Sequence, residues 1–281
     1  MWSDLDLKRL AAEARLDFFT ALGQLGGGHY GACLSVIDLL TYLYFQEMNI
    51  DSANPAWPER DLFVLSKGHA GFGLYAVLAA RGFFPKSRLS AYENGVMLPK
   101  HADKHRIPGV ELSTGSLGIG FSAAVGMAVS LQRSGSSRRV YTLLGDGELN
   151  EGIVWDAAMA ASKYGLDNLT AVIDYNKLQF DGDSNTVMGL EPLAARWQSF
   201  GWQVTEIDGH DFPSIARGFD LARSVRNAPQ VLIAHTVKGK GVPFMEGQTI
   251  WHGGTCSPEQ LEEGLRYLQA QVASLRAEKE V

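Results

Sequence analysis

The clearest chemistry in this sequence lies in two acidic turns. Asp146 sits in a Gly-Asp-Gly turn after the apolar run Val140–Leu144, and Asn176 ends an Asp-Tyr-Asn turn after the run Leu169–Ile173. Short β-branched and leucine-rich runs without alternation are typical of strands buried on both faces. Because the carboxyl ends of parallel strands meet at one edge of a sheet, we expect Asp146 and Asn176 to lie close together. A carboxylate, an amide oxygen and a nearby backbone carbonyl are hard ligands, so the pattern predicts a Mg²⁺ or Ca²⁺ site.

The glycines of the first turn suggest a phosphate next to that metal. Gly145 and Gly147 let the backbone turn sharply and approach a ligand closely. Gly147 and the start of the following helix could add backbone N–H donors to the same phosphate. The pattern favours a Mg²⁺-diphosphate site. Two ordinary turns are the alternative, since Gly-Asp-Gly alone occurs often by chance.

Histidines recur in segments that could reach a ligand. His29 lies in a glycine-flanked loop, His69 follows a predicted strand and a glycine turn, and His101 lies in a long segment that also holds Lys100 and Lys104. From residue types alone, they could equally be a turn residue, a helix-start residue and part of a solvated basic loop. His252 lies after the last predicted strand, in the segment Trp251-His252-Gly253.

The order of elements predicts an α/β fold, a parallel β-sheet flanked by helices on both faces, in one domain spanning residues 1–281. The predicted strands cover residues 61–65, 140–144, 169–173, 201–207 and 230–235. The predicted helices cover residues 5–22, 34–45, 73–80, 190–200 and 213–226, with another running to about Arg133 and a last one over about 257–279. Ser257, Pro258 and Gln260 form the start signal of the last helix. Residues 85–113 lack periodicity and are expected to cross the surface.

Composition excludes several classes of protein. With 281 residues, 46% of them hydrophobic, the chain can bury one sizeable core. A net charge of −6 without long basic runs argues against nucleic acid and against a basic membrane-binding face. Cys33 and Cys256 lack metal-ligand spacing, which favours a reducing, cytoplasmic setting. No signal peptide and no apolar run long enough to span a bilayer are found.

Several blocks of the sequence resemble the transketolase family. They include GGHYGACLS, SKGHA, STGSLGIGFSAAVGMA, the central run GDGELNEGIVWDAAMAASKYGLDNLTAVIDYNKLQFDG, and WHGG, and they extend from about residue 26 to 254 in the family's order. Tyr30 and Ala102 replace prolines of the family pattern, and Ile119 replaces a common glutamine. The resemblance implies a domain that binds thiamin diphosphate with Mg²⁺, for which Ca²⁺ or Mn²⁺ can substitute.

The resemblance also implies roles for individual residues. The metal ligands would be Asp146, Asn176 and the Leu178 carbonyl. Contacts to the cofactor would come from His69, Gly115, Ser116, Leu117, Gly145, Gly147, Asn176 and His252. The substrate channel and its proton transfers would use His29, His101 and His252, and Glu151 would belong to a proton-carrying chain between two active sites. From sequence alone, Glu151 is equally a solvent-facing residue near a helix start, and Lys238 and Lys240 are by default solvated charges.

Transketolases are typically more than twice this long, so the resemblance implies half an enzyme. The pyrimidine-binding and carboxyl-terminal domains, with the Glu that activates the cofactor, are expected on a separate chain. The sequence therefore predicts the amino-terminal subunit of a two-chain transketolase, a heterotetramer that transfers a two-carbon ketol unit from a ketose to an aldose. The sugars are not readable from the sequence, and the pathway could be pentose phosphate, sulfo-sugar, branched-sugar or secondary metabolism.

Three alternatives stay open at this point. The first is the alpha subunit of a 2-oxo acid dehydrogenase, which should lack the SKGHA and STGSLG blocks. The second is a synthase that condenses pyruvate with glyceraldehyde phosphate, usually one long chain. The third is a non-catalytic cofactor-binding homologue, which the replacements at Tyr30 and Ala102 leave possible.

Overall fold

Five parallel strands form the sheet that positions the site, in the order β1-β2-β3-β7-β6. The computed structural model describes residues 2–91 and 97–279. The strands are β1 Leu62–Leu65, β2 Val140–Gly145, β3 Leu169–Tyr175, β6 Gln203–Asp208 and β7 Gln230–His235. Each coincides with a predicted strand to within two residues, and β3 continues two residues beyond its apolar run. The predicted parallel α/β fold is confirmed.

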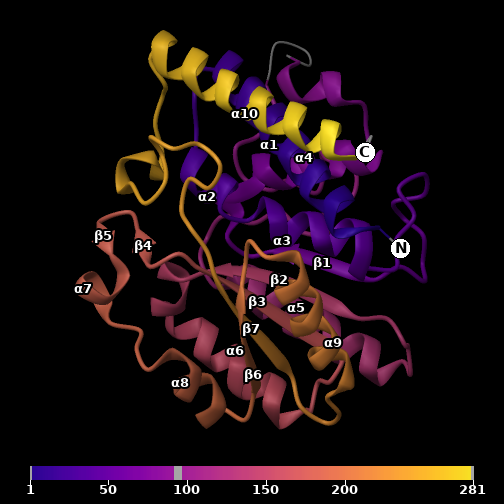
Figure 1. The fold of residues 1–281 in the computed structure, drawn as a ribbon. Coiled ribbons are helices and arrows are strands. Elements are labelled where there is room, and N and C mark those ends of the chain that lie inside the picture. The colour runs from indigo at the N-terminus through magenta and orange to yellow at the C-terminus, as the bar shows by residue number, and fades with distance from the viewer. Residues whose placement is uncertain (1, 92–96, 280–281) are drawn as a thin grey trace.

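Helices cover both faces of the sheet, which explains why its strands are apolar throughout. Figure 1 shows the sheet between the helices of the amino-terminal third and helices α6 and α8. One face packs against α1 Asp4–Gln24, α2 Tyr30–Leu34, α3 Ile37–Tyr42, α4 Gly71–Arg81 and α9 Phe212–Ser224. The other face packs against α5 Ile119–Arg133, α6 Gly152–Lys163 and α8 Leu193–Ser199. Alternate residues of β2, such as Leu143 and Leu144, therefore belong to two separate cores.

The helix predicted over residues 34–45 is broken into three pieces. Helix α2 ends at Leu34, α3 begins at Ile37, and a π-helical turn follows over Leu43–Glu47. At the break, the Ser35 hydroxyl donates to the Ala32 carbonyl at 3.2 Å and to the Asp174 carboxylate at 2.7 Å. A serine that can bond its own backbone and a buried acid competes with continuous helix. The spacing of apolar residues in the sequence does not predict the contact between Ser35 and Asp174.

The segment 85–113 is only partly a surface excursion, so that prediction was wrong in part. Leu98, Ala102, Ile107 and Val110 are buried in the amino-terminal core; residues 92–96 of the segment lie outside the described residues. Ala102 donates its N–H to the Gly68 carbonyl at 3.1 Å and accepts the Thr114 N–H at 3.0 Å. The segment is thereby fixed beside the turn that follows β1.

Helix α10, Pro258–Lys279, packs on its own domain. Its predicted start signal is present: the Gln260 N–H donates to the Ser257 hydroxyl at 3.2 Å, and the Ser257 N–H donates to the Gln260 side chain at 3.0 Å. The buried residues Leu268 and Val272 face inward, and α10 lies across α1 in Figure 1. The buried face of α10 therefore covers α1.

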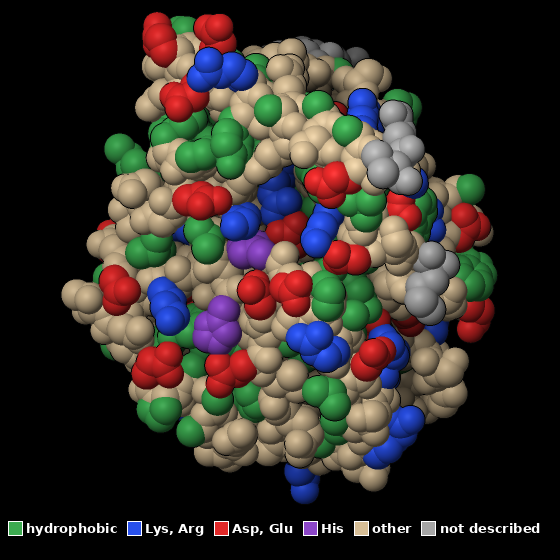
Figure 2. All heavy atoms as spheres, in the orientation of Figure 1, with side chains coloured by type: hydrophobic (Ala, Val, Ile, Leu, Met, Phe, Trp, Pro, Cys, Tyr) green, Lys and Arg blue, Asp and Glu red, His purple; other side chains and the backbone are tan. Residues whose placement is uncertain are grey.

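The outer surface carries charges of both signs. On the face in Figure 2, acidic and basic side chains are interspersed and no continuous basic patch is visible. Within the described residues, no helix is long and apolar enough to cross a bilayer.

The carboxyl ends of all five strands lie along one edge of the sheet, since all pairings are parallel and in register. The segments after these ends carry polar or charged residues: Lys67 after β1, Asp146 after β2, Asn176 after β3, Lys238 after β7 and His210 after β6. This edge is where open α/β sheets bind ligands.

Candidate functional site

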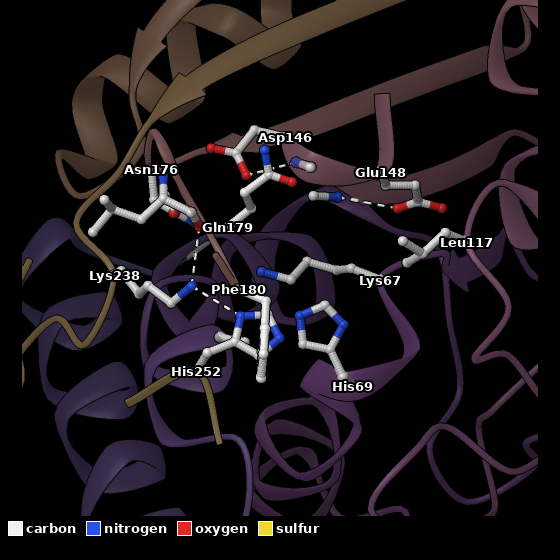
Figure 3. Close-up of a pocket in the computed structure, with 14 residues that line it drawn as sticks. Lys67, His69, Leu117, Asp146, Glu148, Asn176, Gln179, Phe180, Lys238 and His252 are labelled. Carbon is white, nitrogen blue, oxygen red and sulfur yellow. Dashed lines mark hydrogen bonds between the residues drawn. The ribbon is translucent and has the colours of Figure 1, made fainter. Parts of the chain in front are cut away.

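A pocket of about 180 Å³ opens at this edge, at the ends of β1, β2 and β3. Eight of the residues singled out from the sequence line it: His69, Leu117, Gly145, Asp146, Gly147, Asn176, Leu178 and His252. Asp146 and Asn176 thus face one cavity although they follow different strands. In Figure 3 their side chains lie on one side of the pocket, and the rings of His69 and His252 lie on the other.

Asp146 is a buried carboxylate without a counter-ion. It is 3% exposed, and it accepts the Gly147 N–H at 2.8 Å and the Ser184 hydroxyl at 3.3 Å. No ion pair reaches it in the described part of the chain. Burial, and next the charge of Asp174, raise the pKa of Asp146 to about 6. A buried carboxylate in this state is stabilised by any cation that enters the pocket.

Asp174, in the neighbouring strand, is fully buried and fully satisfied. It accepts hydrogen bonds from the Lys67 ammonium, the Ser35 and Thr236 hydroxyls and the Asn176 amide, the last at 3.0 Å. Burial alone would raise the pKa of Asp174, but Lys67 and the hydrogen bonds hold it below the ordinary value. Sequence reasoning missed Asp174 as a functional residue. An acid inside an apolar strand is itself the signal, because a buried charge needs a partner.

Asp174 also orients Asn176. The Asn176 amide nitrogen donates to Asp174, and its oxygen accepts the Leu178 N–H at 3.1 Å. Both contacts assign the same orientation to the side-chain amide. The oxygen of Asn176 keeps a second lone pair for another donor or for a cation.

Two buried lysines face the same pocket. Lys67 and Lys238 are each 2% exposed. The Lys238 ammonium donates to the Leu178 carbonyl at 3.0 Å and lies 3.0 Å from Nδ1 of His252, as the dashed lines in Figure 3 show. Burial, and next the charge of Lys67, lower the pKa of Lys238 to about 8. The default interpretation of Lys238 as a solvated charge was wrong; Lys240, whose side chain is 37% exposed, fits it.

Four histidines from four segments gather at the pocket. The ring centre of His29 lies 5.5 Å from those of His69 and His101 and 6.0 Å from that of His252, and the His69 and His252 rings stack at 5.0 Å. Burial, then nearby positive charge, lower the pKa of His29 to about 4 and of His252 to about 3. The pKa of His69 is lowered in the same direction, mainly by burial. These three imidazoles are therefore neutral at pH 7.

The loops that carry the histidines are tied to one another. Gly28 and Gly254 exchange two backbone hydrogen bonds of 2.8 and 2.9 Å, which join the loop of His29 to that of His252. The Tyr75 hydroxyl donates to the His101 carbonyl at 2.6 Å. The imidazole cluster thus depends on contacts between segments far apart in the sequence.

Five predicted residues lie outside the pocket itself. His29 and His101 belong to the cluster above, and Gly115 lies beside His101, where an added Cβ would come 3.4 Å from the ring. Ser116 and Glu151 are exposed, and Glu151 directly precedes α6. The structure thus brings together the metal and histidine candidates and leaves Ser116 and Glu151 at the surface.

The helix expected after the turn that follows β2 is present as α6, although α6 does not begin directly at that turn. A short 3₁₀ turn, Gly147–Asn150, separates β2 from α6, and the Gly147 N–H already bonds the Asp146 side chain. Inside this turn Glu148 is buried and accepts the N–H groups of Gly118 and Gly145, at 2.8 and 3.1 Å, and the Ser66 hydroxyl. Glu148 therefore fixes three loops around the pocket. Sequence reasoning missed it because an acid after a glycine turn is usually solvated.

The mouth of the pocket is apolar and exposed. Phe180 is 70% exposed on the hairpin β4 Leu178–Gln179 and β5 Gly182–Asp183, and its ring lies 5.3 Å from that of His252. Leu117, 36% exposed, lines the pocket, and the exposed Ile119 follows it closely in the chain. The hairpin was not predicted.

The donor set fits a hard divalent cation and a phosphorylated anion. Among the described residues, no group of three or more His, Cys, Asp or Glu could hold a metal. One carboxylate, one amide oxygen and one carbonyl are instead the ligands that Mg²⁺ or Ca²⁺ takes when substrate oxygens and waters complete its shell. Lys67 and Lys238 supply positive charge for a diphosphate at the same place. The fit rests on the uncompensated charge of Asp146 and on a Leu178 carbonyl that already accepts a cationic group.

Residues 7–270 match the family model described as transketolase, thiamine diphosphate binding domain. The chain belongs to the transketolase family. It is 43% identical over 270 residues to the 6-deoxy-6-sulfo-D-fructose transketolase subunit SqwG of Clostridium sp. (strain MSTE9), covering 96% of this chain and 98% of that protein. It is 40% identical over 271 residues to one subunit of the apulose-4-phosphate transketolase of Actinobacillus succinogenes, covering 95% of this chain and 97% of that protein.

A solved transketolase has the same fold. The transketolase of Campylobacter jejuni superimposes with a TM-score of 0.87 at 28% identity, and the match covers 98% of this chain and 46% of the solved chain. The chain therefore spans about half the length of that transketolase, whereas it matches the two bacterial subunits almost from end to end.

Proposed function

We propose that this chain is the amino-terminal subunit of a two-chain transketolase and binds Mg²⁺ and thiamin diphosphate at the carboxyl edge of its sheet. The observation that carries the proposal is Asp146, a buried carboxylate without a counter-ion that shares its pocket with Asn176 and the Leu178 carbonyl. A site that leaves such a charge uncompensated is costly unless a cation binds there.

In this proposal, Asp146, the Asn176 amide oxygen and the Leu178 carbonyl hold the metal. In the structure the Lys238 ammonium donates to the Leu178 carbonyl. It would therefore leave this carbonyl when the cation binds there, and it could then contact the diphosphate. Lys67, anchored by Asp174, would lie next to the same phosphates. Gly145, Gly147, His69, Gly115, Ser116, Leu117 and His252 complete the proposed cofactor contacts.

Thiamin diphosphate, when bound, supplies the electron sink that a two-carbon ketol transfer needs. The chain's own contribution to the sugar is the cluster of His29, His101 and His252. His29 and His252 are neutral at pH 7, so each has one donor and one acceptor for sugar hydroxyls. Because Lys238 donates to Nδ1 of His252, the proton of that ring lies on Nε2. Proton transfer at hydroxyls within hydrogen-bond reach is the proposed role of these histidines.

A partner subunit with the pyrimidine-binding and carboxyl-terminal domains is part of the proposal, and residues 1–281 would form the single diphosphate-binding domain. Two observations support it. The related proteins are named as subunits, and the chain matches them almost completely. The exposed side chains of Leu117, Ile119, Ile153 and Phe180 at or near the pocket mouth would be covered by a partner. We propose a heterotetramer, in which Glu151 would communicate between active sites.

The proposed substrates are a ketose donor and an aldose acceptor. The two relatives are named for 6-deoxy-6-sulfo-D-fructose and apulose 4-phosphate, and they are 43% and 40% identical to this chain. A donor panel for this chain should therefore include both sugars and ordinary ketose phosphates. Cys33 and Cys256 are free thiols, which is consistent with the proposed cytoplasmic setting.

The test combines binding and turnover. Calorimetry with thiamin diphosphate and Mg²⁺ is run on the chain with its partner subunit, beside the variant Asp146→Asn, and ketol transfer is followed across the donor panel. We expect metal-dependent cofactor binding by the wild-type complex and ketol transfer only when both subunits are present. A complex that binds no cofactor would contradict the proposed site, and a complex that binds the cofactor without ketol transfer would favour the non-catalytic cofactor-binding homologue. Full activity of the lone chain would contradict the split enzyme, and decarboxylation of 2-oxo acids would favour the dehydrogenase subunit.

A further inference from the structure

Lys238 faces the pocket from a loop that is held by hydrogen bonds at several points, among them the Gly239 N–H to the Gly31 carbonyl at 3.1 Å and the Gly247 N–H to the Lys238 carbonyl at 2.9 Å. The loop follows β7 and runs from Thr236 to Gly241 without regular structure. Its Lys238 is buried and bonds the Leu178 carbonyl, so its placement matters for the proposed cofactor site. The Val237 N–H, next to Lys238, is bonded by a side chain from another strand end, that of His210.

His210 holds the backbone next to Lys238. The Val237 N–H donates to Nε2 of His210 at 2.9 Å, and Nδ1 of the same ring lies 2.7 Å from the Asp38 carboxylate. A backbone N–H can only donate, so Nε2 is the acceptor and Nδ1 carries the proton that Asp38 accepts. His210 is therefore held as one neutral tautomer by two partners in different elements.

Asp38 is in turn fixed by Arg15. The two terminal nitrogens of Arg15 on α1 bond both oxygens of Asp38 on α3, one of them at 2.9 Å. Arg15 and Asp38 are 7% and 5% exposed, so this pair is desolvated and well defined. Arg15 also contacts the far end of the Lys238 loop, since a Cβ added at Gly241 would come 2.9 Å from its Cδ.

Arg15, Asp38 and His210 line a second hollow, of about 330 Å³, whose lining residues are all different from those of the cofactor pocket. Figure 2 shows this face, where basic, acidic and histidine side chains gather below helix α10. Lys8 and Lys240 at its rim have nearby acids: Lys8 pairs with Asp4 at 2.7 Å, and Lys240 lies 3.8 Å from Glu246.

We infer that His210, held by Asp38 and Arg15, is a positioning residue that sets the Val237–Lys238 backbone and thereby places Lys238 at the cofactor pocket. The inference rests on the proposed function for the meaning of that placement. It assigns a role to the end of β6, the edge strand, which contributes no residue to the pocket itself. His210 would act on the reaction only through Lys238.

Two replacements of His210 separate its two hydrogen bonds. In His210→Asn the amide can occupy the place of Nδ1 and donate to Asp38, but nothing accepts the Val237 N–H. In His210→Gln the longer side chain can place its oxygen near Nε2 and accept that N–H. The matched control is His235→Asn at the end of β7, because the exposed His235 ring bonds the exposed Glu206 at 2.7 Å, lies 5.7 Å from the Tyr175 ring and, among the described residues, makes no hydrogen bond to the Lys238 loop.

The first measurement is amide hydrogen exchange of the full chain with its partner and without cofactor. We expect His210→Asn to speed exchange in peptides covering residues 236–241, while peptides from β2 and β3 keep their protection. His210→Gln should restore most of the protection, and His235→Asn should match the wild type. Unchanged protection of residues 236–241 in His210→Asn would overturn the inference. Equal loss in both His210 variants would also overturn it, since packing rather than the acceptor would then matter.

The second measurement is calorimetric binding of thiamin diphosphate with Mg²⁺. We expect His210→Asn to weaken binding by up to about 10-fold, the loss expected for removing Lys238 itself, because His210 acts only through Lys238; His210→Gln should recover most of this loss. Binding by His210→Asn at wild-type affinity would contradict the inference. A wild-type complex that binds no cofactor would instead refute the proposed function, and hydrogen exchange would still decide whether His210 fixes the loop.

Discussion

Asp146 and Asp174 come from adjacent parallel strands, but they differ in whether a positive side chain pairs with their charge. Both are at most 3% exposed, and Gly145, which precedes Asp146, pairs in register with Asp174. Asp174 accepts a lysine and three neutral donors, and its pKa is lowered against the effect of burial. Asp146 has one backbone N–H and one hydroxyl, and burial raises its pKa to about 6.

The comparison indicates that two acids at one edge of the sheet have different roles: Asp174 stabilises the structure, and Asp146 is proposed to bind a ligand. Asp174 uses its charge inside the protein, where it fixes Lys67, Asn176 and Thr236. Asp146 has no ion pair in the described part of the chain, and in the proposed function a bound cation compensates its charge. A structural acid is therefore recognised by its partners, and a ligand-binding acid by the partners that it lacks.

The largest effect should follow from breaking the Asp174 cluster. Asp174→Asn leaves the Lys67 ammonium buried without its counter-ion, which should lower the free energy of unfolding by about 3 to 5 kcal/mol. Urea denaturation of the metal-free chain measures it. The double variant Lys67→Met with Asp174→Asn should recover part of the loss, because no unpaired charge then remains. A single variant as stable as the wild type would mean that the pair is not buried in solution.

Asp146→Asn should have little effect on stability and a large effect on cofactor binding. The metal-free chain should be as stable as the wild type or slightly more so, because an uncompensated buried carboxylate is removed. The affinity for thiamin diphosphate in the presence of Mg²⁺ should fall by about 100-fold, which corresponds to about 2.7 kcal/mol. Calorimetry measures the affinity and urea denaturation the stability. Unchanged affinity would remove Asp146 from the proposed metal site.

The two acids should also give opposite pH dependences in the metal-free chain. The folded-state pKa of Asp146, about 6, lies above its unfolded value of 3.8, so between these values the folded chain binds more protons. Raising the pH from 4 to 6 should therefore destabilise the wild type relative to Asp146→Asn, by up to about 2 to 3 kcal/mol. The lowered pKa of Asp174 instead contributes stability that is kept above pH 4 and lost below it. Denaturation curves from about pH 2 to pH 7 test both signs, since the Asp174 contribution is lost only below pH 4; a difference between wild type and Asp146→Asn that does not change with pH would contradict the first.

The smallest effect should come from Lys240, compared with its neighbour Lys238. Lys240→Ala removes a partly exposed charge and should change the free energy of unfolding by less than about 0.5 kcal/mol, with cofactor affinity unchanged. Lys238→Met should leave the fold intact and weaken cofactor binding by roughly 10-fold, about one charge-assisted hydrogen bond. Equal effects of the two variants would mean that burial of Lys238 carries no function.

The strands of the sheet could be predicted from the sequence, but the charged side chains that bond one another at its carboxyl edge were not singled out. Apolar runs located all five strands, and Ser257 with Gln260 located the start of α10, because these signals are local. Asp174, Glu148 and Lys67 were not singled out, although each bonds residues far away in the chain. A charged residue beside a strand looks the same in sequence whether water or a buried partner satisfies it.

The sequence by itself determined the parallel α/β fold, the family, and the two turns that carry Asp146 and Asn176. These follow from short-range patterns of apolar residues, glycines and acids that need no knowledge of which segments meet. Only the tertiary structure decided which charges are compensated: Lys67 reaches Asp174, while Asp146 is left without a counter-ion, and Val237 bonds a histidine from a different strand end. The physical reason is that the electrostatic state of a buried group depends on neighbours brought together by folding.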